Sequence, residues 1–107
     1  MTIPTNPVDP AADVRVRRIV LDGEIDVATA PKAFAAVIAV NPSPGDVVTL
    51  DLGDVDFIDS RGVAMLLKAR SYCDGMGCQL TLANASPPVK RVLDVLGLME
   101  QFHFESG

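Results

Sequence analysis

The chain has 107 residues, of which 49% are hydrophobic and 21% charged, a composition typical of one globular domain and not of two cores or a disordered chain. Its formal net charge of -5 and isoelectric point of about 4.6 argue against direct nucleic-acid binding, which needs basic surfaces. No apolar stretch approaches the ~20 residues that span a bilayer, and the first residues lack the pattern of a signal peptide. We therefore expect a cytoplasmic protein with no membrane association.

The N-terminal residues 1–13 contain three prolines and few apolar side chains, which predicts a flexible arm. Residues 14–107 are expected to form a single domain. Its first strand is predicted over residues 14–21, followed by a polar turn over residues 22–26. A helix is then predicted after Thr29, a residue type that can cap a helix N-terminus.

The middle of the chain predicts a second strand and a second helix. Residues 47–52 (VVTLDL) are mostly apolar and β-branched, as in a buried strand, and residues 53–59 are predicted to be a loop. A helix is predicted over residues 60–73, ended by the Gly-Met-Gly sequence at residues 75–77.

The rest of the chain predicts a strand at residues 78–83, a helix at residues 86–97 and a short strand at residues 101–104. The alternating order indicates an α/β fold with about four mostly parallel strands and three or more helices. Binding sites in such folds lie at the carboxyl ends of the strands. Three loops are expected there, beginning at Asp22, Gly53 and Asn84.

The segment at residues 56–63 (DFIDSRGV) carries the most specific chemistry. Ser60 lies where the predicted loop passes into a helix, close to free backbone N–H groups and the positive end of the helix dipole. A phosphate there would gain about one to three charge-assisted hydrogen bonds, with Arg61 as a further donor. Gly62 has no side chain, so the first turn of the helix is narrow there and a second protein can approach the serine closely. The alternative is that Ser60 only caps the helix.

Three segments, in order and in register, resemble the STAS domain shared by sulphate transporters and anti-sigma factor antagonists. The segment FIDSRGVAMLL is similar to the family's D-S-x-G-x-x-x-L signature. The segment LDGEIDVATA resembles the family's L-x-G-E-L-D segment. The segment ASPPVKRVLDVLGL resembles the family's S-P-x-V-x-R-x-L-x-x-x-G-L segment. Together the three segments extend the resemblance over residues 14–104, nearly the whole predicted domain.

The resemblance implies a STAS-like fold and a phosphorylation switch. In anti-sigma factor antagonists the serine after the signature Asp, which is Ser60 here, is phosphorylated by the anti-sigma factor, an ATP-using serine kinase. The unphosphorylated antagonist binds that kinase and so frees the sigma factor, and a metal-dependent serine phosphatase reverses the modification. These implications predict a protein that is not an enzyme and needs no cofactor. The alternative is a STAS-type sensory or scaffold module without a phosphorylation cycle.

The chain departs from the family pattern at three places. Arg61 stands where a second serine often follows the first. The proline-rich residues 1–13 do not resemble the extra edge strand with which the family usually begins, and the family's closing helix has no counterpart before Gly107.

A partner-binding surface is predicted around Ser60. On the second helix Arg61, Met65, Lys68 and Tyr72 recur at helical spacing, and a methionine and a tyrosine among cations on an outer face suit an adaptable interface. The alternative is an ordinary surface with scattered apolar residues. The residues expected to contact a partner are Asp22, Gly23, Glu24, Asp26, Asp59, Ser60, Arg61, Gly62 and Met65.

Enzymatic and metal-binding alternatives have less support. A serine hydrolase would need a histidine near Ser60, and the only histidine, His103, is predicted to face outward on the last strand. The carboxylates of Asp22, Glu24 and Asp26 have no accompanying substrate residues, so a solvated turn explains them. A magnesium site is conceivable but not expected, because loop aspartates are ordinarily turn formers; its ligands would be Asp51, Asp54, Asp56 and Asp59.

The two cysteines, Cys73 and Cys78, are too few for a disulfide framework. They are interpreted as small buried hydrophobic residues. A redox-sensitive bridge between them is the alternative, and it requires their Cα atoms to lie within about 7 Å of each other.

Overall fold

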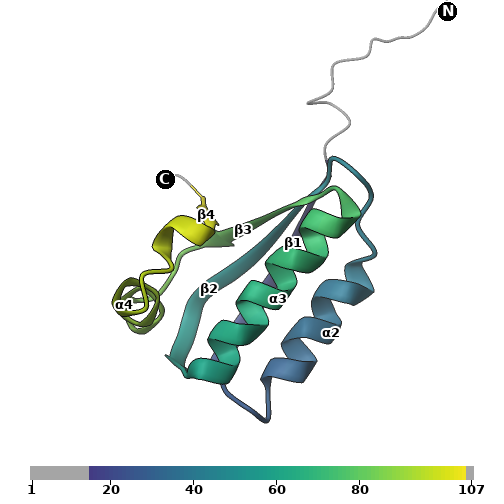
Figure 1. Cartoon of the computed structure of the whole chain (residues 1–107). Coiled ribbons are helices and arrows are strands. Elements are labelled where there is room, and N and C mark those ends of the chain that lie inside the picture. Colours follow the sequence, from purple (N-terminus) through teal and green to yellow (C-terminus); the bar gives the residue numbers. More distant parts are fainter. Residues whose placement is uncertain (1–14, 106–107) are drawn as a thin grey trace, which may run out of the picture.

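The computed structural model describes residues 15–105 and contains one parallel sheet flanked by helices (Figure 1). The predicted flexible arm and the last two residues lie outside the described part. Strand β1 (Val16–Ile25) leads to helix α2 (Ala30–Val40), and β2 (Val47–Ile58) leads to α3 (Ser60–Met76). Then follow β3 (Gln79–Ala83), α4 (Pro87–Val95), the 3₁₀ helix η2 (Met99–Gln101) and β4 (His103–Phe104).

The four strands lie in the order β1-β2-β3-β4, and every neighbouring pair is parallel. This arrangement confirms the predicted α/β fold. Each strand returns to its neighbour through a helix, as parallel pairing requires. Strand β1 is one edge of the sheet, and the carboxyl ends of β1 and β2 reach the start of α3 together.

The core lies between the sheet and the helices α2 and α3, which cover one face (Figure 1). The register aligns Ile19, Leu50 and Leu82 in an apolar row across three strands, and Leu50 and Leu82 are almost fully buried. The helices bury the following side chains toward this core: Ala33, Val37, Leu66, Ala69 and Cys73. Helix α4 lies apart from these two helices and packs against β2, where Val89 and Leu93 are buried.

Both long strands extend further than the sequence predicts. The predicted turn at residues 22–26 is mostly strand, because β1 runs to Ile25, and the predicted loop at residues 53–59 is strand up to Ile58. The reason is mutual pairing: Ile25 pairs with Ile58, so the polar backbone between gains ladder hydrogen bonds despite its polar side chains. Two register shifts accommodate this pairing, and Gly23 at one of them has a φ of 67°.

The hydroxyl groups of the two predicted helix-capping residues, Thr29 and Ser86, do not cap their helices. Thr29 and Ser86 occupy the N-cap positions of α2 and α4, but neither side chain accepts a hydrogen bond from its helix. The Thr29 hydroxyl donates to the Glu24 carbonyl at 2.6 Å, and the buried Ser86 hydroxyl donates to the Val55 carbonyl at 2.7 Å. These hydroxyls therefore tie each helix to the strand that it follows or packs against.

Helix α3 continues to Met76, three residues beyond its predicted end, because Gly75 remains helical and Gly77, with a φ of 76°, ends the helix. Strand β4 is shorter than the predicted residues 101–104, because only His103 and Phe104 pair with β3. No helix among residues 15–105 combines the length and apolarity that crossing a membrane demands.

Candidate functional site

Ser60 is the first residue of α3 and is exposed, as the sequence predicts. The cap of this helix is Asp59, however, so the alternative interpretation, that Ser60 only caps the helix, is wrong. One Asp59 carboxylate oxygen, Oδ1, accepts hydrogen bonds from the N–H groups of Arg61 at 2.9 Å and Gly62 at 3.1 Å. Ser60 is therefore one position inside the helix, and its hydroxyl does not serve as the helix cap.

This cap changes the electrostatics expected around Ser60. We expected free backbone N–H groups at the helix start that could bind a phosphate. The N–H groups of Arg61 and Gly62 instead already donate hydrogen bonds to the Asp59 carboxylate. A phosphate on Ser60 would carry about -1.5 to -2 charges next to that carboxylate. The two anions would compete for the same donors at the helix N-terminus.

Gly62 is buried, contrary to the expectation that it leaves room for a second protein. A β-carbon built at this position would lie 2.5 Å from the Ile25 carbonyl oxygen and 2.6 Å from Cγ1 of Ile58. The glycine thus lets the first turn of α3 sit directly on the ends of β1 and β2. Its position supports the fold beneath Ser60 and leaves it little exposed surface, so its contact with a partner stays a prediction.

The end of β1 lies beside the start of α3, so the two predicted segments share one rim of the sheet. The Asp59 N–H donates to the Ile25 carbonyl at 3.3 Å, which joins the segments directly. On β1 the side chains of Asp22 and Glu24 are exposed. Asp26 is half-buried, and hydrogen bonds from the N–H groups of Ala28 and Thr29 hold the pKa of its carboxyl below the usual value.

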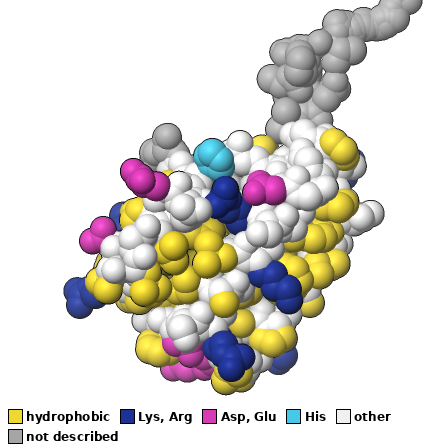
Figure 2. All heavy atoms as spheres, in the orientation of Figure 1, with side chains coloured by type: hydrophobic (Ala, Val, Ile, Leu, Met, Phe, Trp, Pro, Cys, Tyr) yellow, Lys and Arg dark blue, Asp and Glu magenta, His cyan; other side chains and the backbone are white. Residues whose placement is uncertain are grey.

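The sequence predicts Met65 on an outer face of the helix, and this prediction is wrong. Met65 is buried, with 4% of its surface exposed. The reason is that α2 packs against α3 and covers this position. Met65 lines an open groove of about 310 Å³ between the two helices, which we call the α2–α3 groove. Its lining residues are Val27, Ala30, Pro31, Phe34, Arg61, Ala64, Met65 and Lys68. Figure 2 looks onto this side of the molecule and shows hydrophobic side chains with Lys and Arg side chains among them.

The aromatic wall of this groove comes from α2 and was missed by the sequence analysis. The Phe34 ring packs edge to face against Tyr72, with 6.1 Å between centroids, and the Lys68 ammonium lies 4.5 Å from the Phe34 centroid. Phe34 falls at the apolar spacing of the predicted helix, and no functional role was predicted for it. Only the packing of α2 on α3 shows that its ring also borders a surface groove.

A second groove, of about 320 Å³, lies on another side of the same rim, between the end of β2 and the start of α4. Phe57 contributes to it with 48% of its surface exposed, together with Pro87, Pro88 and Arg91. Phe57 was predicted to lie in a loop, with no functional role. A phenylalanine within a predicted loop, three residues before Ser60, was the signal in the sequence that could have identified it.

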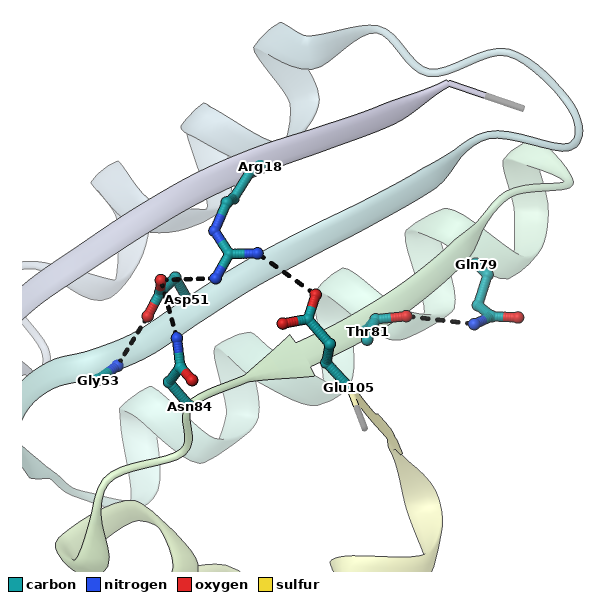
Figure 3. A network of polar contacts seen from close by, with 7 residues as sticks. All are labelled: Arg18, Asp51, Gly53, Gln79, Thr81, Asn84 and Glu105. Atoms are coloured by element: carbon teal, nitrogen blue, oxygen red, sulfur yellow. Dashed lines mark hydrogen bonds and ion pairs between the residues drawn. The ribbon is translucent and has the colours of Figure 1, made fainter. Parts of the chain in front are cut away.

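No three of the four aspartates considered as magnesium ligands are brought together by the fold. Asp51 is held on the sheet face opposite α2 and α3, where it accepts hydrogen bonds from Arg18, Asn84 and the Gly53 N–H (Figure 3). The Gly53 N–H and the Arg18 guanidinium hold the pKa of this carboxyl below its usual value. Within residues 15–105 no group of three His, Cys, Asp or Glu side chains is arranged to bind a metal.

The remaining candidates lie away from Ser60. His103 is exposed on β4, as predicted, and borders a different groove with Arg70 and Gln101. Cys73 and Cys78 are free thiols and buried, and burial together with the neighbouring Cys78 raises the pKa of Cys73 to about 12. Their burial agrees with the interpretation as small buried hydrophobic residues, and a redox-sensitive bridge between them stays the alternative.

Comparisons with known proteins point to one family. The family model of the STAS domain matches residues 10–106. A STAS-domain containing protein of Pseudomonas aeruginosa is 30% identical over 87% of this chain and 91% of its own length. The anti-sigma-B factor antagonist of Listeria monocytogenes is 30% identical over 77% of this chain and 72% of its own length.

Solved structures share the fold. The anti-sigma factor antagonist SpoIIAA in its unphosphorylated form superposes with a TM-score of 0.68 at 22% identity, covering 86% of this chain and 81% of that protein. A sulfate transporter family protein from Wolinella succinogenes gives a TM-score of 0.69 at 23% identity, covering 91% of this chain and 87% of that protein. The family match over most of the chain and the common parallel-sheet fold agree, and this protein belongs to the STAS domain family.

Proposed function

We propose that this protein is an anti-sigma factor antagonist, a binding protein and not an enzyme, that is switched by phosphorylation of Ser60. The observation that carries the proposal is the exposed hydroxyl of Ser60, directly after the capping Asp59 at the start of α3. The same residues are the D-S-x-G part of the family signature. The name of the Listeria relatives, anti-sigma-B factor antagonist, supports the same role.

The proposed partner is an anti-sigma factor serine kinase, which the unphosphorylated protein binds in the cytoplasm, releasing a sigma factor. The binding surface would comprise the exposed part of the rim, namely Asp22, Glu24, Ser60 and Arg61. Gly23 in β1 and Asp26 directly after it would shape this rim, while Asp59 and Gly62 would position the serine from below. A metal-dependent serine phosphatase would restore the binding form.

Phosphorylation would weaken binding by electrostatics. The phosphate would place about -1.5 to -2 charges beside Asp59 and compete with its carboxylate for the N–H groups of Arg61 and Gly62. Either the cap is disturbed or the phosphate projects outward, and both outcomes alter the surface that a partner meets. Because the rim already carries Asp22 and Glu24, the added charge falls on a surface with several acidic groups.

The test is phosphoryl transfer from ATP by the anti-sigma factor kinases of the same organism. Wild-type protein should gain the mass of one phosphoryl group, and Ser60→Ala should gain none. Ser71→Ala is the matched control, because Ser71 is also exposed on α3 but lies away from the rim. Labelling of Ser60→Ala to the wild-type level would show that another residue carries the phosphate.

Binding provides the second part of the test. Ser60→Ala should bind the kinase as the wild type does, whereas Ser60→Asp should bind more weakly, and the difference should shrink in high salt if charge repulsion causes it. If no kinase labels the protein and a partner binds Ser60→Asp as tightly as wild type, the protein is instead a constitutive scaffold.

A further inference from the structure

The α2–α3 groove combines an apolar lining with two cations and no carboxylate. Of its eight lining residues only Arg61 and Lys68 are charged, and both come from α3. The apolar part includes the exposed Val27, the ring of Phe34 and the methyl group of Ala64. An apolar surface of this kind next to the proposed phosphorylation site is suited to a protein partner.

The two cations are available to a partner. Among residues 15–105 neither Arg61 nor Lys68 forms an ion pair, whereas Arg18 and Arg70 both do. Lys68 rests over the Phe34 ring at 4.5 Å, an arrangement that keeps its ammonium beside the groove. This local positive charge contrasts with the net charge of -5 on the whole chain. Charge complementarity therefore favours an occupant with carboxylates.

The shape of the groove favours a polypeptide segment over a small molecule. Its volume of about 310 Å³ is at the lower end of the roughly 300–1,000 Å³ typical of small-molecule pockets, and it is open along two helices. Amphipathic helices bind such grooves by inserting apolar side chains at successive turns.

We propose that the α2–α3 groove docks an acidic amphipathic segment of the anti-sigma factor, which inserts an apolar side chain against Phe34 and Ala64 and pairs a carboxylate with Arg61 or Lys68. The inference rests on the proposed function and adds the chemistry of the partner's contact. It also gives Arg61 a second role, because a phosphate on the adjacent Ser60 would compete with the partner's carboxylate for the guanidinium.

Two variants with matched controls test the groove. Ala64→Trp fills it from an exposed helix position, and Ala39→Trp makes the same change at an exposed α2 position outside the lining. Lys68→Glu reverses one cation at the groove, and Lys90→Glu reverses an exposed cation on α4. Circular dichroism and thermal melting establish that each variant folds, and if Ala64→Trp fails to fold, Lys68→Glu still decides the matter.

The measurement is the affinity of unphosphorylated protein for each anti-sigma factor kinase of the same organism, by isothermal titration calorimetry. We expect both groove variants to bind at least about tenfold more weakly than wild type, since central interface residues commonly cost this much, and the controls to stay within about twofold. The loss in Lys68→Glu should diminish at high ionic strength, and the loss in Ala64→Trp should persist.

The outcomes separate this inference from the function on which it rests. If the wild type binds no such kinase, the proposed function and the docking proposal both fail. If the wild type binds and the groove variants bind as tightly as their controls, only the docking proposal fails. Tighter binding by Lys68→Glu would show a basic occupant and would equally overturn it.

Discussion

Gly62 lies so close to Ile25 that a β-carbon on the glycine would be 2.5 Å from the Ile25 carbonyl oxygen. The contact sets how closely the first turn of α3 approaches the end of β1, and through it where Ser60 stands on the rim. Backbone atoms cannot move aside as a flexible side chain can. The site around Ser60 therefore depends on the absence of a side chain two residues later.

Gly62→Ala should destabilise the protein by about 1–3 kcal/mol, the usual cost of overpacking, because the added methyl group meets a backbone oxygen and Ile58. Gly75→Ala is the matched control, since nothing lies within 4 Å of a β-carbon there and the residue is helical. That control should be neutral or stabilising by up to about 1 kcal/mol. Urea unfolding of both variants measures the difference, and equal stabilities would contradict the assigned role of Gly62.

The capping assignment predicts an order of stability for two adjacent substitutions. Asp59→Ala removes the acceptor of two backbone N–H groups and should cost about 0.5–2 kcal/mol. Ser60→Ala should cost less, because its hydroxyl is exposed and does not cap α3. Thermal unfolding of the two variants checks the order. A larger loss for Ser60→Ala would mean that the serine takes part in the cap.

Ser86 should be needed for the attachment of α4. Its buried hydroxyl donates to the Val55 carbonyl at 2.7 Å, so Ser86→Ala leaves a buried acceptor without its donor and should cost about 1–3 kcal/mol. Ser71→Ala, at an exposed position on α3, should change the free energy of unfolding little. Amide hydrogen exchange in α4 should also increase in Ser86→Ala, and unchanged exchange there would contradict the proposed tie.

Stability should decrease in acid. Hydrogen bonds from backbone N–H groups hold the pKa values of Asp26 and Asp51 below the ordinary value, and Arg18 adds to the effect on Asp51. A carboxyl with a lower pKa in the folded state stabilises the protein above its unfolded pKa of about 4, and the contribution disappears as the pH falls through the folded pKa. Urea midpoints should therefore decline progressively below about pH 4.

The corresponding variants identify the groups responsible. Asp26→Asn and Asp51→Asn should be less stable than wild type near neutral pH, and the difference should narrow in acid, where the wild-type carboxyls are protonated. Asp94→Asn, at an exposed position on α4, is the control and should follow the wild-type curve. A difference that stays constant across the pH range would show that the two carboxylates act only through packing.

The thiol of Cys73 should react slowly in the folded protein. Burial raises its pKa to about 12, so almost no thiolate is present at neutral pH, and the side chain has no exposed surface. Alkylation by iodoacetamide, followed by mass spectrometry, should label Cys73 far more slowly in native protein than in urea. Rapid native labelling, or a bridge to Cys78 formed by mild oxidants, would favour the redox interpretation instead.

The order of the elements and the place of Ser60 could be predicted from the sequence alone. Apolar runs such as VVTLDL and glycines such as Gly77 are local signals, because burial and backbone freedom act over a few neighbouring residues. The start of α3 at Ser60 was predicted from the local pattern in the same way, and the resemblance to the D-S-x-G signature agrees with it. The parallel sheet followed from the alternation of strands and helices.

What the tertiary structure alone decided depends on contacts between segments distant in the sequence. Residues 22–25 and 53–58 are polar enough to indicate a turn and a loop, yet each becomes strand because the other supplies hydrogen-bond partners. Met65 has the helical spacing of a surface stripe, and only the packing of α2 buries it. Gly62 is required because the Ile25 carbonyl lies above it, a contact between residues 37 positions apart that no local pattern of side chains records.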